Sequence, residues 1–261
     1  KSEIGRLGAL PDSVTAIAVN DTLRALGDIA RFRRRMFSAP VLAITGSSGK
    51  TTTKEMAAAI IGAQRRLLKT EGNFNNLIGL PLTLLRLNDT HEAVILELGT
   101  NRRGEIARLT EIAEPAIGLI TNIGSAHLEG FKTIETVKEE KGDLFRGLSE
   151  SGIAVVNNDS PVLKELAARH CGKCVTYAVD QEADLRAANI EGDGNRMRFD
   201  LIVGGAKGRV TLKASGRHSI YNALGAAAAS WVMGIAPESI RRGLESFRPV
   251  AGRMELVALR N

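Results

Sequence analysis

The chain has 261 residues, of which 44% are hydrophobic and 25% charged, so it can bury a sizeable core and is not expected to be disordered. Its formal net charge of +6 at pH 7 would suit nucleic acid, anionic lipid or phosphorylated small molecules, but aromatic residues at only 4% argue against the stacking surfaces of nucleic-acid-binding proteins. The sequence has neither an apolar run of about 18 residues nor a signal peptide, which predicts a cytoplasmic protein without membrane insertion.

The first predicted element is a helix over Asp21–Arg35, which we interpret as a connecting helix after the end of a preceding domain in residues 1–40. Its last part carries the densest basic run, Arg31–Arg35. Such a run is usually a solvated helix face or the edge of a linker. A nucleic-acid-dependent ATPase remains an alternative that the basic charge leaves open.

From Val41 onward, short β-branched apolar runs alternate with longer segments of helical period, which predicts an α/β fold with a mostly parallel sheet flanked by helices. The predicted strands are Val41–Thr45, Ala93–Leu98, Ile117–Thr121, Ile153–Asn157 and Val175–Val179. The predicted helices are Lys50–Gly62, Gly104–Ala113, Ile134–Leu148, His218–Met233 and Pro237–Phe247. Alternating residues between about Ala183 and Ala214 predict a small antiparallel β patch. Residues 41–250 are assigned to one central domain and residues 251–261 to a hinge.

A glycine-containing loop lies between the first predicted strand and helix, with the sequence Gly46-Ser47-Ser48-Gly49-Lys50-Thr51-Thr52. Glycines allow a tight turn in which backbone N–H groups converge on phosphate oxygens, and the helix start adds the positive end of its dipole. We expect Lys50 to reach the β- and γ-phosphates and the Thr51 hydroxyl to bind magnesium. The pattern is a short form, because the general P-loop pattern has glycine where this chain has Ile44. The guanine-reading pattern N-K-x-D is absent from the sequence, which favours ATP.

Glu97 closes the apolar run of the second predicted strand. A magnesium ion shared with phosphates needs oxygen ligands, and an acidic side chain at the end of a neighbouring strand supplies one. We therefore predict that Glu97 binds the metal. A charged residue that merely caps a strand at the surface is the alternative, which the apolar Leu98 that follows disfavours.

Together these motifs resemble the Mur ligases, from about Asp21 to the end of the chain. That family usually carries the loop as T-G-T-N-G-K-T, where this chain has Ser47-Ser48 in place of Thr-Asn. The segments Glu71–Asn76 and Ile78–Thr83 are similar to those of the D-alanyl-D-alanine-adding branch. Glu97–Asn101 is similar too, although that branch more often has Met-Gly-Ala-Asn. The resemblance implies the fold of the family's central ATP-binding domain.

The resemblance also implies roles for residues that spacing alone does not single out. His127 matches a histidine that binds a second magnesium ion in the family. Lys141 matches a lysine that is carbamylated there and so becomes a carboxylate-like metal ligand. Asn222 matches the asparagine on the adenine side, and Arg253 matches an arginine of the hinge that reaches the nucleotide phosphate or ribose.

The implied reaction is ATP-dependent amide ligation in peptidoglycan synthesis. The terminal carboxylate of a UDP-linked muramoyl peptide attacks the γ-phosphate of ATP to give an acyl phosphate, and the amine of D-alanyl-D-alanine then displaces the phosphate from it. Lys50 and two magnesium ions would offset charge on the transferred phosphoryl group, while Asn75 and Asn76 would help to position the acceptor or the phosphate. The family's full enzymes have three domains. We therefore expect this chain to keep a Mg-ATP site but to perform little ligation by itself.

Two further alternatives stay open at this point. The first is an amide ligase of the same superfamily that adds a different amino acid, because the acceptor is indicated only by the branch-like segments. The second is a nucleotide-binding regulator without catalysis. That second class is disfavoured because the residues of the implied machinery are all present, namely Lys50, Thr51, Glu97, His127 and Lys141.

Overall fold

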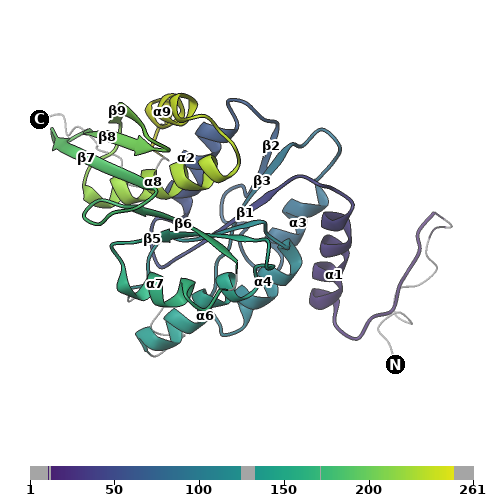
Figure 1. Cartoon of the computed structure of the whole chain (residues 1–261). Helices are drawn as coiled ribbons and strands as arrows, with labels where there is room; N and C mark the ends of the chain where they lie inside the picture. The colour runs from purple at the N-terminus through teal and green to yellow at the C-terminus, as the bar shows by residue number, and fades with distance from the viewer. Residues whose placement is uncertain (1–10, 12, 125–132, 171, 250–261) are drawn as a thin grey trace, which may run out of the picture.

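The computed structural model describes residues 11, 13–124, 133–170 and 172–249 (Figure 1). Its strands form one nine-stranded sheet in the order β2-β3-β1-β4-β5-β6-β7-β8-β9. The bounds of the strands are β1 Val41–Thr45, β2 Leu67–Lys69, β3 Ala93–Glu97, β4 Ile117–Ile120, β5 Ile153–Asn157, β6 Lys173–Ala178, β7 Leu185–Gly192, β8 Met197–Val203 and β9 Ala206–Leu212. The strands from β2 to β7 pair in parallel, and β7, β8 and β9 pair antiparallel. The predicted α/β fold and its antiparallel patch are confirmed.

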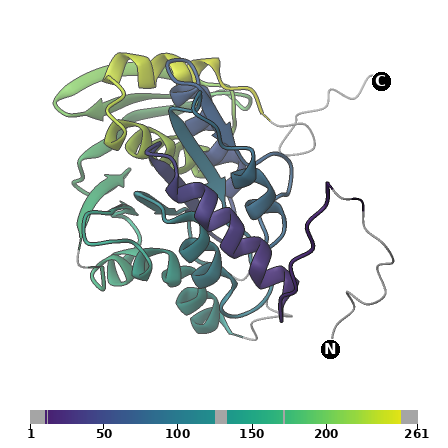
Figure 2. The same cartoon turned by 90° about the vertical axis from the view of Figure 1, so that its right-hand side faces the viewer.

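Helices cover both faces of this sheet (Figures 1 and 2). One face carries α2 (Lys50–Ile61), α8 (Arg217–Val232) and α9 (Pro237–Ser246). The opposite face carries α1 (Thr22–Arg35), α3 (Gly79–Leu85), α4 (Glu105–Ala113), α6 (Ile134–Arg146) and α7 (Pro161–Ala167). Two hydrophobic cores result, one on each side of the sheet.

Strand β1 shows why its sequence is an unbroken apolar run. Leu42 and Ile44 point into the core beneath α2 and α8, whereas Val41 and Ala43 point into the core of the opposite face. A strand buried on both faces cannot alternate polar and apolar residues. Both neighbours of β1 are also parallel strands, β3 and β4. The chain passes to β2 and β3 on one side and then to β4 on the other, so the carboxyl end of β1 is a topological switch point, where α/β sheets bind ligands.

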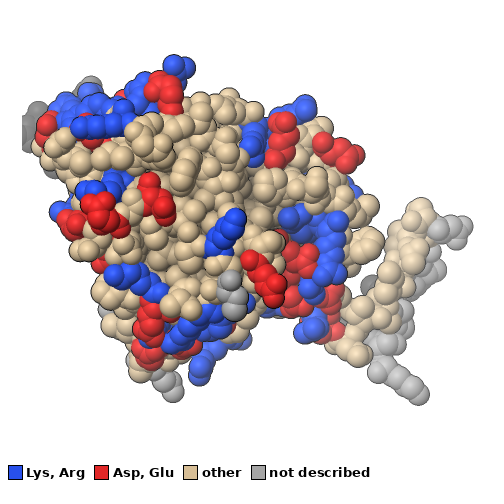
Figure 3. All heavy atoms as spheres, viewed as in Figure 1, with Lys and Arg blue, Asp and Glu red and all other residues tan. Residues whose placement is uncertain are grey.

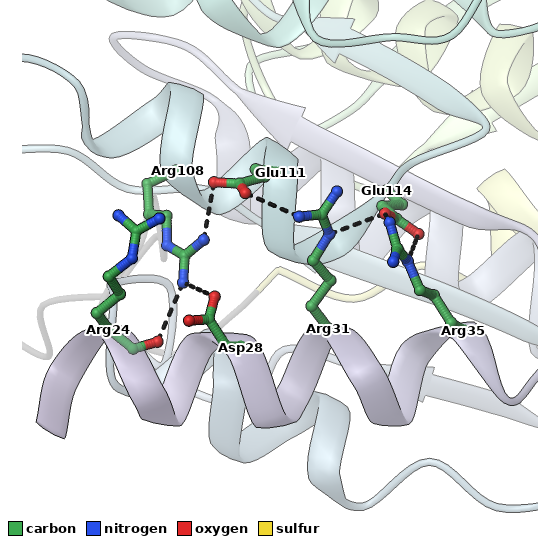
Figure 4. Close-up of polar contacts among 7 residues, drawn as sticks. All are labelled: Arg24, Asp28, Arg31, Arg35, Arg108, Glu111 and Glu114. Atoms are coloured by element: carbon green, nitrogen blue, oxygen red, sulfur yellow. Dashed lines mark hydrogen bonds and ion pairs between the residues drawn. The ribbon is translucent and has the colours of Figure 1, made fainter. Parts of the chain in front are cut away.

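The predicted connecting helix forms α1, and the Asp21 side chain accepts a hydrogen bond from the Arg24 N–H at its start. This helix is not a free linker, because it packs against α3 and α4. Acidic and basic side chains lie side by side over it (Figure 3). Its basic residues bind partners on the body of the protein. Arg31 pairs with Glu111 and Glu114, and Arg35 pairs with Glu114 (Figure 4). Arg33 and Arg34 donate to the carbonyl groups of Leu87 and Ala113.

The side chains of the basic run Arg31–Arg35 therefore attach α1 to the body of the protein, while the Arg35 side chain stays 57% exposed on the helix face. The same contacts weaken the nucleic-acid alternative, because the guanidinium groups are already bonded within the fold. No helix in the described ranges has the length and apolar character needed to cross a membrane.

Candidate active site

The loop between β1 and α2 requires glycine at two positions. Gly46 has a φ of +149°, and a β-carbon there would lie 1.9 Å from the Thr121 hydroxyl. Gly49 has a φ of +80°, and a β-carbon there would lie 2.4 Å from the Asn222 side-chain oxygen. Residues with a β-carbon rarely adopt such φ values. The loop is thus closed in on two sides, by the end of β4 and by α8.

The end of β4 holds this loop by hydrogen bonds. The Ser47 N–H donates to the backbone oxygen of Asn122 at 3.0 Å, and the Ser48 N–H donates to the Asn122 side-chain oxygen at 2.9 Å. The Thr121 hydroxyl donates to the Ser48 carbonyl at 2.5 Å. Two of the loop N–H groups predicted to face phosphate are therefore directed at Asn122 in this structure.

Lys50 begins α2 and folds back over the loop. Its ammonium group donates to the Gly46 carbonyl at 2.7 Å. The Lys50 side chain thus places its positive charge, from the end of the loop, beside the residue at which the loop begins. Thr52 follows Lys50 on α2 and is half-buried. The structure brings all the predicted loop residues, Gly46 to Thr52, to the carboxyl end of β1.

Glu97 and Thr51 meet at this edge of the sheet. Glu97 ends β3 opposite Ile44 of β1, and it is only 2% exposed. The Thr51 hydroxyl donates to Glu97 Oε2 at 2.9 Å, and the Asn75 amide donates to Glu97 Oε1 at 3.0 Å. Both carboxylate oxygens are therefore oriented by neighbours, and the interpretation of Glu97 as an exposed strand cap is wrong.

These donors fit a magnesium ion. The Thr51 hydroxyl and the Glu97 carboxylate are hard oxygen ligands only 2.9 Å apart, and magnesium in nucleotide sites takes one or two such protein ligands together with phosphates and water. In the described part of the chain, no three His, Cys, Asp or Glu side chains gather as a metal cluster. His127, the predicted second ligand, lies outside the described residues.

Lys141 reaches the site from α6 and is 2% exposed. Burial, followed by the nearby charge of Lys50, lowers the pKa of Lys141 from 10.5 to about 8, and Glu140 opposes this shift. The Glu140 carboxylate accepts hydrogen bonds from the N–H groups of Gly104 and Ile106 at 2.6 and 2.9 Å. These bonds attach α6 to the start of α4. Because the pKa of Lys141 is lowered, part of its amine is neutral near physiological pH.

The other predicted site residues divide into those that lie near the loop and those that do not. Asn222 on α8 is buried beside Gly49 and accepts a hydrogen bond from the Thr53 hydroxyl at 3.3 Å. The Asn76 side chain instead accepts the N–H groups of Ile78 and Gly79, at 3.1 and 2.9 Å, and so caps α3. Arg253 lies outside the described residues.

Sequence reasoning missed two residues that adjoin Glu97. Lys54 on α2 is buried with its ammonium 4.0 Å from Glu97 Oε2, and the Thr70 hydroxyl accepts the Glu97 N–H at 3.0 Å. A lysine four positions after Lys50 lies on the same helix face, which was the available signal. No sequence signal pointed to Thr70, because the short strand β2 that precedes it was not predicted.

A family model for the Mur ligase middle domain matches residues 44–230. The chain belongs to this family. The match begins within β1 and ends within α8, so it includes the glycine loop and Glu97. The resemblance drawn from the motifs is thus confirmed at the level of the family.

Other Mur ligase sequences are similar over nearly the whole chain. A UDP-N-acetylmuramoyl-tripeptide–D-alanyl-D-alanine ligase from Escherichia coli strain K12 is 39% identical over 242 residues, which cover 91% of this chain and 53% of that protein. The enzyme of the same name from Bacillus subtilis strain 168 is 36% identical over 95% of this chain and 53% of its own length. The chain therefore spans about half the length of these relatives.

Solved Mur ligase structures share the fold. A crystal structure of MurF from Acinetobacter baumannii has a TM-score of 0.88 at 32% identity and covers 96% of this chain and 56% of that one. MurF ligase from Thermotoga maritima, in complex with ADP, has a TM-score of 0.83 at 28% identity. The match covers 94% of this chain and 56% of that one.

Proposed function

We propose that this chain is the ATP-binding part of a ligase that adds D-alanyl-D-alanine to a UDP-N-acetylmuramoyl-tripeptide in peptidoglycan synthesis. The observation that carries the proposal is the pairing of Thr51 with Glu97 beside a glycine loop, in a chain whose relatives bear that activity in their names. A cytoplasmic location belongs to the same proposal. Residues 41–250 form the proposed ATP-binding unit, with the proposed hinge at 251–261.

The nucleotide is proposed to be ATP, bound with its phosphates at the loop. The ADP complex of the Thermotoga maritima relative supports an adenine nucleotide. Lys50 supplies a positive charge at the loop, and the start of α2 adds the positive end of its dipole. Asn222 and Arg253 are proposed to contact the adenine side and the phosphate or ribose.

Magnesium would be held by Thr51 and Glu97, with His127 and carbamylated Lys141 as the proposed ligands of a second ion. When bound, magnesium would supply positive charge against the oxygens of the transferred phosphoryl group. The depressed pKa of Lys141 supports carbamylation, because the neutral amine is the form that reacts with carbon dioxide. Among the described residues, Thr51 and Glu97 thus offer oxygen ligands for magnesium, and Lys141 offers an amine for carbamylation.

The reaction is proposed to begin when the terminal carboxylate of the muramoyl peptide attacks the γ-phosphorus of ATP. The bond to ADP breaks, and an acyl phosphate forms. The amine of D-alanyl-D-alanine then attacks the acyl carbon, and inorganic phosphate leaves as the amide forms. Lys50 offsets negative charge during the transfer. Asn75, bonded to Glu97, is proposed to position the acceptor or the phosphate together with Asn76.

The test uses the protein at its natural full length. ATP consumption and the mass of the product are measured with the tripeptide precursor and D-alanyl-D-alanine, with either omitted, and with other amino acids or dipeptides as the amine. We expect ATP consumption and a new amide only when both proposed substrates are present. If the enzyme forms an amide with a different amino acid or dipeptide, D-alanyl-D-alanine is not its acceptor and the proposal is wrong on that point. ATP hydrolysis that needs DNA or RNA instead would refute the ligase.

A Glu97→Gln variant tests the assignment of the site. The amide keeps the size of the side chain but removes the negative charge that magnesium requires, so ligation is expected to fall by about a hundredfold or more. The dependence of the residual rate on magnesium concentration is measured beside it. An unchanged rate and magnesium requirement would show that the metal is held elsewhere.

A further inference from the structure

Lys54 is a buried lysine that the phosphate-loop pattern does not explain. It lies on α2 one turn after Lys50, and its side chain is 1% exposed. A buried ammonium group is costly unless hydrogen bonds and opposite charges compensate its lost hydration. The Lys54 ammonium donates to the Thr70 carbonyl at 2.8 Å and lies 3.0 Å from a Glu55 oxygen. It also lies 4.0 Å from Glu97 Oε2, the oxygen that accepts the Thr51 hydroxyl.

Thr70 links Lys54 to the strand that carries Glu97. The Thr70 N–H donates to the Ile95 carbonyl at 3.0 Å, and the Thr70 hydroxyl accepts the Glu97 N–H at 3.0 Å. Lys54 binds the remaining polar group, the carbonyl. The backbone at the end of β2 is thus fixed to α2 on one side and to β3 on the other.

The segment that leaves Thr70 returns to Glu97 a few residues later. The Asn75 amide donates to Glu97 Oε1 at 3.0 Å, and the Gly99 N–H donates to the Asn75 carbonyl at 2.8 Å. The approach is close, since a β-carbon on Gly99 would lie 2.7 Å from the Asn75 side-chain oxygen. Residues 71–75 therefore form a short bridge that is anchored at Thr70 and ends on the carboxylate.

We propose that Lys54 is a positioning residue of the metal site: it fixes Thr70, and through it the bridge 71–75, so that Asn75 holds Glu97 Oε1 while Thr51 holds Oε2. The inference rests on the proposed function of Glu97 as a magnesium ligand. Partners of a metal ligand orient it and are energetically important although they do not touch the ion.

A Lys54→Met variant tests this role. Methionine fills similar space without a buried charge, and Glu55 keeps its partner Lys69, so the fold is expected to form. Binding of a non-hydrolysable ATP analogue is measured by calorimetry, once with magnesium and once with EDTA. We expect the gain in affinity that magnesium confers to fall about tenfold or more, with little change in EDTA. Backbone hydrogen exchange in residues 71–75 should become faster.

The matched control is Lys69→Met. It makes the same replacement and also removes a cation from Glu55, but it leaves the Thr70 carbonyl bonded to Lys54. We expect its magnesium gain and its exchange rates to equal those of the unmodified chain. An effect of the same size in both variants would show that loss of charge near Glu55 is the cause, which overturns the positioning role.

A second variant, Thr70→Val, removes the hydroxyl from the other side of the same link and tests the proposal independently should Lys54→Met fail to fold. It should also reduce the magnesium gain selectively. Unchanged gains in the folded variants, or equal losses with magnesium and with EDTA, would overturn the inference. An unmodified chain that binds the analogue equally well with and without magnesium would instead refute the proposed role of Glu97.

Discussion

Gly46 occupies a point where the loop backbone passes directly against the Thr121 side chain. We predict that Gly46→Ala lowers the free energy of unfolding by about 1–3 kcal/mol, because the new methyl group would lie 1.9 Å from the Thr121 hydroxyl. Nucleotide affinity should fall as well, since the loop must shift to make room. Urea unfolding and analogue titration measure the two effects.

Gly194→Ala, in the turn between β7 and β8, is the control for the backbone conformation alone. Gly194 also has a positive φ, of +78°, but a β-carbon there would meet nothing within 4 Å. This variant should show only the modest cost of placing alanine at positive φ, with nucleotide affinity unchanged. Equal behaviour of the two variants would mean that the contact with Thr121 is unimportant.

The buried amine of Lys141 predicts a pH dependence of stability. Its pKa is lowered to about 8 in the folded chain from 10.5. Below pH 8 both states are protonated and the full cost of the buried charge is present. Between pH 8 and 10.5 the unfolded state alone keeps the proton, so Lys141 contributes a rise in the free energy of unfolding across this window.

Lys141→Met should remove that rise and increase stability at pH 7, in urea unfolding series in buffers free of carbon dioxide. Lys138→Met is the contrasting control. Hydrogen bonds to Glu165 and Glu135 raise the pKa of Lys138. That residue therefore contributes stability below its unfolded pKa, and the contribution is lost as the pH rises through its folded pKa. Parallel pH profiles for the two variants would contradict this account.

At the scale of elements, one of the links between α1 and α4 is a carboxylate that binds two arginines. Glu114 ends α4 with a φ of +40° and pairs with Arg31 and Arg35 at 2.9 and 2.5 Å. We predict that Glu114→Gln lowers the free energy of unfolding by about 1 kcal/mol at low salt and that the loss shrinks in 1 M salt, because exposed ion pairs are screened. Protease cleavage within α1 should accelerate.

Glu165→Gln provides a comparison for that variant, because Glu165 also binds two cations, Lys138 and Arg169, but joins α6 to α7. It should leave cleavage within α1 unchanged. If both variants expose α1 equally, the helix is held by its apolar contacts and Glu114 has no special role.

The predictability of the elements follows from their length and burial. Strands such as β1 and β3 were found because they are continuous apolar runs, and the Thr51–Glu97 pair followed because neighbouring parallel strands end at one edge. The elements β2, α3 and α7 were missed, since three to seven residues are too few to display a period. Lys54 was missed because its partner Thr70 stands at the end of one of these short elements.

The position of Asn222 illustrates a different limit. It lies 169 residues after its hydrogen-bond partner Thr53, on a helix whose alanine-rich sequence indicates burial but not orientation. Periodicity cannot say which long-range neighbour a helix meets. Only the family resemblance brought Asn222 to the nucleotide site, and its contact with adenine stays a prediction.

At the scale of the whole molecule, the chain covers about half of the relatives that it matches. We predict that the 261-residue chain binds an ATP analogue with magnesium but forms little or no amide from the tripeptide precursor and D-alanyl-D-alanine. Calorimetry and mass spectrometry on the same preparation separate the two activities. Robust product formation would contradict this prediction, because it would show that these 261 residues suffice for ligation.

The three antiparallel strands carry none of the proposed ligands, yet they are bonded in series to the strands that do. Excising residues 185–212 would strip β6 of its neighbour β7 and leave a row of unsatisfied amide and carbonyl groups. It would also uncover the apolar side of α8 that rests on those strands. A shortened chain would therefore self-associate through the exposed edge of β6. The three antiparallel strands thus protect the edge of the parallel part of the sheet, and they are a poor place for truncation.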